Sequence, residues 1–403
     1  MDDEMGQTEK RDSLRKLFLP SLVASNFAAG PLAVLVSLLL VDIGNTFNVS
    51  VGVMGQINIS YSIAAFIFAL LMGILSLRFN HKLLLLAGLF FMCISALGCF
   101  LAWDFNMMLI SYSLSGLGWA MISSMAVTLI GEHLPVARRA GAISWIVAGG
   151  ALSYVIGPPM IATIAGFSGW RYTLASFVIP ILLASLLLTF IGVPSASRSR
   201  EPSASGKIYL RSFTDVLSNR SAVACLVGDA LRSAAFVALL FYGASFIRQK
   251  FLMPAGFASI VILGAALCYT LGSLVTGPLV NKFGRKTLTV LTAFLAGIFT
   301  ICYVSAPDLW FSVALILVAS WFFGMVASAA NSLTLEQVPR FRGTTMSLDT
   351  AALNVGSAFG TAMGGLMLLS FGYEGLGSVL GAIGIVAAFV FYLFTIDPAR
   401  SAT

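Results

Sequence analysis

Long apolar runs, separated by short polar connections, constrain this chain more than any other feature of its sequence. Twelve such runs can be drawn, and each is close to the roughly 20 residues that a helix needs to cross the hydrocarbon layer of a bilayer. They are Leu17–Ile43, Gly52–Leu75, Leu83–Trp103, Met107–Ile130, Ala142–Ile164, Tyr172–Val193, Ala222–Phe246, Phe257–Val280, Thr287–Val304, Leu309–Leu335, Thr344–Leu369 and Gly375–Ile396. The sequence therefore predicts twelve transmembrane spans.

We expect every span to be a helix. An open strand in lipid would leave backbone donors and acceptors unsatisfied, and the runs lack the period-two alternation of a membrane β-barrel. Only 10% of the residues are charged, against about 25% in soluble domains. A soluble enzyme, a nucleic-acid-binding protein and a disordered scaffold are excluded, and an all-α membrane protein is the fold class that remains.

The basic residues are concentrated in alternate connections. With both termini in the cytoplasm, 19 of the 23 Lys and Arg residues lie inside, and only Arg171, Arg248 and Lys250 lie outside; Arg232 lies within a run. Such a bias sets the orientation of a multi-pass protein and places its positive charge beside the anionic inner leaflet, so no nucleic-acid partner is needed. We expect a multi-pass protein of the plasma membrane with both termini cytoplasmic.

The chain reads as two halves joined by a linker. A Ser-, Pro- and Arg-rich stretch predicts a cytoplasmic linker at 194–220, between six-helix bundles at 1–193 and 221–403. A shift of 204 residues aligns Gly73–Lys82 with Gly277–Lys286, and the same shift aligns Glu132-x-x-Pro135-x-x-Arg138 with Glu336-x-x-Pro339-x-x-Arg342. Six helices per half predict a parallel repeat about an axis along the membrane normal.

These features together resemble the major facilitator superfamily. The stretch Gly277-x-x-x-Asn281-Lys282-x-Gly284-Arg285-Lys286 is close to that family's G-x-x-x-D-R-x-G-R-K loop motif, with a degraded copy at Gly73–Lys82. The chain is most similar to the drug:proton antiporter branch, although its motifs are degraded. Tyr112 stands where that branch carries an arginine before Gly116-x-Gly118, and only Gly157-Pro158 survives of the helix-5 motif.

The loop motifs predict a cytoplasmic gate. A glycine at a helix end permits close crossing, and Arg/Lys clusters can pair with acids across the two halves and release them when that face opens. An alternative is that the bases only satisfy the inside-positive rule. The residues assigned to the gate are Gly73, Arg78, Glu132, Arg138, Gly277, Lys282, Gly284, Arg285, Glu336 and Arg342.

Two charged residues within the seventh run are candidates for a proton and substrate pathway. A charge at mid-membrane costs roughly 3 kcal/mol on insertion scales, so it must face protein or water. Asp229 and Arg232 are three residues apart and share one helix face. Either Asp229 is a proton or cation site with Arg232 as its switchable partner, or the two form a fixed ion pair.

Other polar residues give weaker indications. Asn26, Asn331 and Asn354 lie inside apolar runs, and Tyr112 and Trp119 share one face of the fourth run with two serines. These residues either line the pathway or pack between helices. Asp349, about two turns into the eleventh run, can carry protons or pair with Arg342. A small-x-x-x-small pattern at Gly356, Gly360 and Gly364 predicts close helix packing.

The leading hypothesis is secondary active transport of a small molecule by alternating access, namely proton-coupled efflux of an amphipathic compound by a monomer in contact with membrane lipids. The alternatives are proton-coupled uptake of an organic anion or nutrient, and a non-transporting sensor with the same fold. We expect no enzymatic activity, because the chain lacks H-E-x-x-H, G-x-S-x-G and Walker A motifs. No cofactor and no metal are expected, since the five cysteines and two histidines show no metal-ligand spacing.

Overall fold

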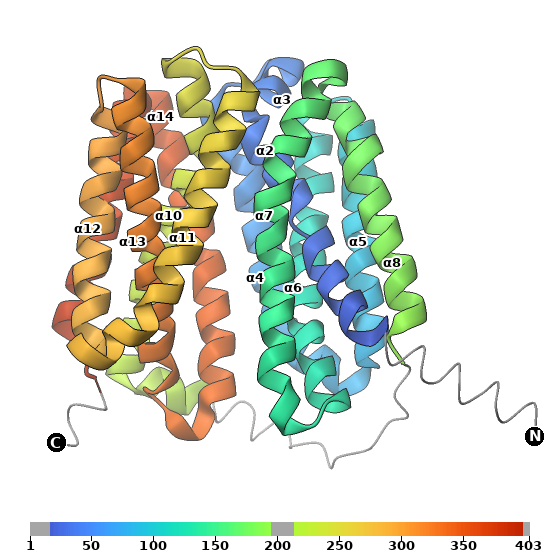
Figure 1. Ribbon diagram of the computed structural model, residues 1–403, viewed down its shortest axis with the longest axis vertical. Coiled ribbons are helices and arrows are strands. Elements are labelled where there is room, and N and C mark those ends of the chain that lie inside the picture. The colour runs from blue at the N-terminus through green and yellow to red at the C-terminus, as the bar shows by residue number, and fades with distance from the viewer. Residues whose placement is uncertain (1–16, 195–212, 398–403) are drawn as a thin grey trace, which may run out of the picture. The chain divides into compact units, whose positions relative to one another are not determined.

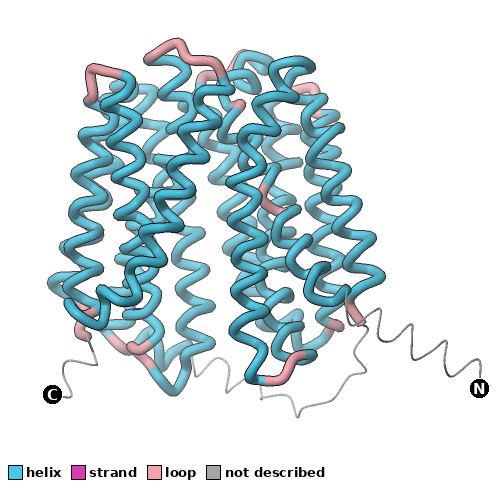
Figure 2. The backbone as a smooth tube through the Cα atoms, in the orientation of Figure 1, coloured by secondary structure: helices cyan, strands magenta, loops and turns pink. Residues whose placement is uncertain are grey.

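The computed structural model describes residues 17–194 and 213–397, and Figure 2 shows long helices joined by short loops over these residues. A helix at 17–28 precedes the first labelled element, and a short one lies at 213–218 within the part of the expected linker that is described. The labelled helices are α2 (Pro31–Leu38), α3 (Leu40–Phe47), α4 (Val51–Arg78), α5 (His81–Leu101), α6 (Phe105–His133), α7 (Val136–Thr173), the π-helix η1 (Leu174–Val178), α8 (Ile179–Gly192), α10 (Arg220–Lys250), α11 (Ala255–Phe283), α12 (Arg285–Ser305), α13 (Leu309–Leu335), the 3₁₀ turn η2 (Pro339–Phe341) and α14 (Arg342–Phe394).

Ten helical segments in the described ranges are long and apolar enough to cross a membrane. Two of them, Gly141–Gly192 and Thr344–Phe394, have 52 and 51 residues. At 1.5 Å per residue each would be about 75 Å long, far more than the roughly 30 Å hydrocarbon layer. Each contains one glycine outside helical geometry, Gly169 at φ 80° and Gly372 at φ 66°. These glycines bend each segment into two spans, so the twelve predicted spans are recovered.

The internal repeat is visible in the element boundaries. The helices α4, α5 and α6 begin at Val51, His81 and Phe105, and α11, α12 and α13 begin 204 residues later, at Ala255, Arg285 and Leu309. The caps repeat as well. Asp104 accepts the Met107 N–H before α6, and Asp308 accepts the Trp310 and Phe311 N–H groups before α13. The predicted 204-residue repeat is therefore a repeat of structure.

Contacts divide the described residues into two compact units. The first comprises 17–36 and 67–194, where α5 packs along α6 and also contacts α7 and α8. The packing of α5 on α6 is close because it occurs at glycines: a Cβ on Gly88 would lie 3.0 Å from the Gly118 carbonyl oxygen. Figure 1 shows these helices as long and nearly vertical in the view.

The second unit comprises 37–66 and 213–397. In it α10 packs along α14, α12 packs against α13 and α14, and α11 packs against α13. The early segment 37–66 joins this unit through polar bonds to α14: the Asn58 amide donates to Ser357 Oγ at 3.0 Å, and Ser62 Oγ donates to the same hydroxyl at 3.0 Å. The division at the linker into 1–193 and 221–403 stays a prediction.

Large apolar side chains cover the outside of the helices. Leu187, Leu274, Trp310 and Phe389 are each more than half exposed. Water would disfavour such a surface, whereas lipid tails are its natural solvent.

Candidate functional site

A buried ion pair lies on α10. Arg232 Nε donates to Asp229 Oδ1 at 2.8 Å, one helical turn away, and the two side chains are 6% and 0% exposed. The second oxygen of Asp229 accepts from the Thr334 hydroxyl of α13 at 3.2 Å. The spacing predicted that Asp229 and Arg232 share a face, and the structure places them in direct contact.

A second carboxyl joins the pair. Asp349 of α14 is 1% exposed, and Asp229 and Arg232 both act on its charge. Its carboxyl interacts with that of Asp229, and its Oδ1 has no hydrogen-bond partner among the described residues. We refer to Asp229, Arg232, Thr334 and Asp349 as the acid cluster.

Close packing of α10 on α14 explains how these residues meet. A Cβ on Gly356 would overlap the Ala230 carbonyl oxygen, and one on Gly360 would overlap that of Ala234. Ser233 Oγ donates to the Leu353 carbonyl at 2.8 Å, between the same helices. The small-residue pattern on α14 thus forms the close contact it predicted, and it brings Asp349 beside Asp229.

The acid cluster holds more acid than base. With all three ionisable groups charged, two carboxylates face one guanidinium, and the cluster carries one uncompensated negative charge. Away from water such a charge costs several kcal/mol, so the arrangement favours one further positive charge, which a proton or a cationic group can supply.

The other residues expected along the pathway are dispersed. Asn26 donates to the Leu22 carbonyl of its own helix, and Asn354 donates to the Thr350 carbonyl of α14. Tyr112 is buried on α6, Trp119 is half-buried and Asn331 is exposed. Neither of these two amide bonds crosses to another helix, and the acid cluster contains none of these five residues.

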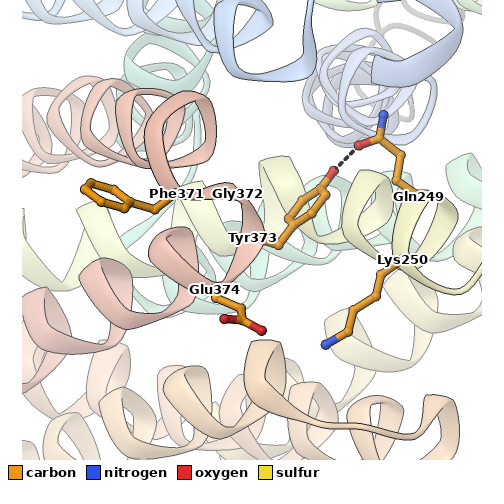
Figure 3. Close-up of a pocket in the computed structure, with 6 residues that line it drawn as sticks. All are labelled: Gln249, Lys250, Phe371, Gly372, Tyr373 and Glu374. Atoms are coloured by element: carbon orange, nitrogen blue, oxygen red, sulfur yellow. Dashed lines mark hydrogen bonds between the residues drawn. The ribbon is translucent and has the colours of Figure 1, made fainter.

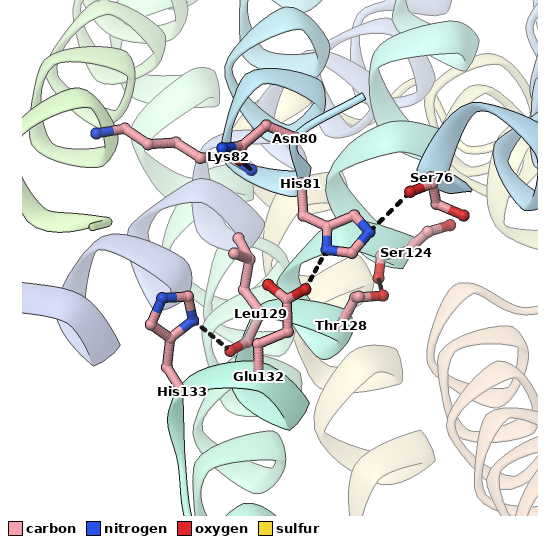
Figure 4. A network of polar contacts seen from close by, with 9 residues as sticks. All are labelled: Ser76, Asn80, His81, Lys82, Ser124, Thr128, Leu129, Glu132 and His133. Atoms are coloured by element: carbon pink, nitrogen blue, oxygen red, sulfur yellow. Dashed lines mark hydrogen bonds and ion pairs between the residues drawn. The ribbon is translucent and has the colours of Figure 1, made fainter. Parts of the chain in front are cut away.

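At the end of α6 in the first unit, Glu132 has a partner from its own half. His81 Nδ1 lies 2.6 Å from Glu132 Oε1, and His81 Nε2 lies 3.1 Å from the Ser76 carbonyl (Figure 4). Both ring nitrogens of His81 therefore face oxygen atoms. The expected pairing of Glu132 with a base of the other half stays a prediction.

The remaining gate residues differ in what they contact. Gly284 adopts φ 86° between α11 and α12, a conformation that favours glycine. A Cβ on Gly277 would meet no described atom within 4 Å, and its role in close helix crossing stays a prediction. Lys282 lies 5.4 Å from the Phe283 ring centroid.

Other members of the predicted gate occupy helix ends. Arg78 ends α4, Arg138 is exposed near the start of α7, Arg285 begins α12 and Glu336 follows α13. The burial of Gly73 and the side chain of Arg342 lie outside what the structure describes.

Two features lie at the far end of α10. Arg248 forms a two-pronged ion pair with Asp42 of α3, with Nη2 2.9 Å from Oδ1. A pocket of about 360 Å³ is lined by Gln249, Lys250, Phe371, Gly372, Tyr373 and Glu374, and Tyr373 donates to Gln249 at 2.7 Å (Figure 3). Twenty residues of helix, about 30 Å, separate this pocket from the acid cluster.

The sequence identified Asp349 as a candidate for carrying protons but did not predict that it joins Asp229 and Arg232. It gave no indication of the roles of Thr334 and His81. An ionisable residue inside an apolar run was the available signal for Asp349. A threonine in such a run ordinarily bonds its own helix, and nothing in the sequence marked Thr334. Within the described residues, no group of three or more His, Cys, Asp or Glu side chains could hold a metal ion.

A family model described as Major Facilitator Superfamily matches residues 22–250 and 231–403. An uncharacterized MFS-type transporter of Bacillus subtilis (strain 168), YwfA, is 24% identical over 404 residues, covering 97% of this chain and 96% of the relative.

Three solved structures share the fold at low identity. A D-xylose–proton symporter is similar with a TM-score of 0.78 and 17% identity, over 94% of this chain and 98% of the other. A point mutant of the nucleoside transporter NupG is similar with a TM-score of 0.77 and 15% identity, over 93% of this chain and 99% of the other. A bacterial homologue of the human lysosomal transporter Spinster, solved in an inward-facing and unoccupied conformation, is similar with a TM-score of 0.73 and 17% identity, over 94% of this chain and 96% of the other.

Proposed function

Since the chain belongs to the major facilitator superfamily of membrane transporters, we propose that it exports an amphipathic small molecule across the plasma membrane in exchange for protons. It acts as a monomer with both termini cytoplasmic, and it alternates between states open to either face. The acid cluster on α10, α13 and α14 is the site where protons couple to transport.

The observation that carries this proposal is the buried charge in the acid cluster. Asp229 and Arg232 lie in an apolar span and are closed to water, where each charge is costly to keep. A fixed ion pair of Asp229 and Arg232 alone would be electrically neutral. The second carboxyl, Asp349, adds a negative charge and makes the cluster a site for one positive charge.

The same charge count favours a cationic or neutral substrate. The guanidinium of Arg232 is already bound to Asp229, so an organic anion would find no free cation in the acid cluster. This argues against the uptake of an organic anion. Export is proposed on the antiporter-like Gly116-x-Gly118 and Gly157-Pro158 motifs.

Purified protein in proteoliposomes tests the proposal. Cationic, neutral and anionic amphipathic compounds are offered under an imposed pH gradient. We expect cationic compounds to accumulate in vesicles with an acidic lumen, and collapse of the gradient to stop accumulation. Proton-coupled movement of anions would support uptake instead, and binding without movement would support a sensor; either result overturns the proposal.

Asp229→Asn separates coupling from binding. The substitution keeps the shape of the side chain and removes its charge, leaving Arg232 to pair with Asp349. We expect gradient-driven accumulation to be lost while exchange of labelled for unlabelled compound continues. Asp104→Asn, which makes the same change of residue type at a helix cap that is not part of the cluster, is the matched control and should behave as the parent does.

A further inference from the structure

One oxygen in the acid cluster lacks a partner. Asp229 accepts two hydrogen bonds, one on each oxygen, from Arg232 and Thr334. Both oxygens of Asp229 are therefore occupied as hydrogen-bond acceptors. Asp349 Oδ1 is buried without a partner among the described residues, although the Asp349 carboxyl interacts with that of Asp229.

A proton on one of the two carboxyls would provide the hydrogen-bond donor that this arrangement lacks. A carboxylate only accepts hydrogen bonds, so two ionised carboxylates cannot bond to each other. When one is protonated it gains an O–H donor that the other can accept. The proton also cancels the one uncompensated negative charge, whose burial would cost several kcal/mol.

We propose that Asp349 is the proton carrier of this transporter, and that its O–H donates to the Asp229 carboxyl, whose oxygens also accept from Arg232 and Thr334. The assignment deepens the proposed function and rests on it for the meaning of the proton in transport. In the transport step the Asp349 O–H bond breaks and the proton passes to water on the face that is open; no electron is transferred.

The other titratable groups that act on the cluster do not supply this proton. Cys225 on α10 interacts with Asp229 and Asp349, and Tyr269 on α11 interacts with Arg232. Both are neutral in their protonated forms and contribute no charge to the count. Asp229 and Arg232 therefore act as positioning residues, since they fix where the proton of Asp349 lies.

Infrared spectroscopy of the purified protein in lipid at neutral pH tests the assignment without any substrate. A protonated carboxyl gives a C=O stretching band distinct from that of a carboxylate. We expect such a band in the parent, its loss in Asp349→Asn, and its retention in the control Asp104→Asn. A parent without the band, or an Asp349→Asn protein that keeps it in full, would overturn the proposal.

A second variant keeps the test decisive if Asp349→Asn does not fold. In Asp229→Asn one carboxyl and one guanidinium remain, so the cluster is neutral without a proton and the band should disappear. Its persistence would contradict the charge count. Because the band requires no transport, its presence with inactive proteoliposomes would refute the proposed function and leave the proton assignment standing.

Discussion

The two halves of the chain repeat their scaffold closely. Lys82 donates to the Phe190 carbonyl at the end of α8, and Lys286, 204 residues later, donates to the Thr395 carbonyl after α14. Each lysine also lies over an aromatic ring near that carbonyl. These cations bind the exposed carbonyls at a helix C-terminus, where positive charge is favourable.

A second pair of contacts is repeated with a different cation. In the first half Arg171 donates to the Phe100 and Ala102 carbonyls. In the second, Lys250 donates to the carbonyls that lie 204 residues later, those of Val304 and Ala306, although the two cations are themselves 79 positions apart. With Arg248 bound to Asp42, all three basic residues predicted on the outer side have a structural partner.

The acid cluster is not repeated. At a spacing of 204 residues, the positions of Asp229, Arg232, Thr334 and Asp349 correspond to Ser25, Ala28, Ile130 and Trp145. None of these four carries a charge, and the Ser25 hydroxyl bonds within its own helix. What both halves share is the structure of the bundle, and what only the second half carries is the chemistry. Substitutions should therefore have equal effects at repeated contacts and unequal effects at the acid cluster.

The largest expected effect is that of Arg232→Ala. It leaves two buried carboxyls without a cation, and breaking a buried ion pair in this way costs about 3–5 kcal/mol. We expect a large fall in the thermal unfolding midpoint in detergent. Asp229→Ser combined with Arg232→Ala copies the first half at both positions and should be more stable than Arg232→Ala alone. A double variant that is no more stable would contradict the charge count.

The next effect concerns the close approach of α10 and α14. Gly360→Leu places a side chain where a Cβ already overlaps the Ala234 carbonyl, and such overpacking costs about 1–3 kcal/mol. The position 204 residues earlier is Ile156, which is exposed. Ile156→Leu is the matched control and should leave the unfolding midpoint unchanged. Equal midpoints for Gly360→Leu and the parent would show that the helices separate easily.

The sequence predicted the features that depend on local pattern. Apolar length predicted the spans, and Gly169 and Gly372 only decide where two long segments bend. The contact between Asp229 and Asp349 could not be predicted, because it requires knowing which helix packs on α10. The glycines of α14 predicted close packing without naming a partner. The pair Asp42–Arg248 joins residues 206 positions apart, beyond what spacing within one element can reveal.

The smallest expected effect should be equal in the two halves. Asp104→Ala and Asp308→Ala each remove a side chain that caps a helix at equivalent positions, α6 and α13, and loss of such a cap costs about 1 kcal/mol. Each substitution should lower the unfolding midpoint modestly and by the same amount, while Asp104→Asn and Asp308→Asn, which keep an accepting oxygen, should restore most of the loss. A large difference between the two alanine variants would mean that these caps are equivalent in geometry but not in energy, and that the likeness of the halves is confined to shape.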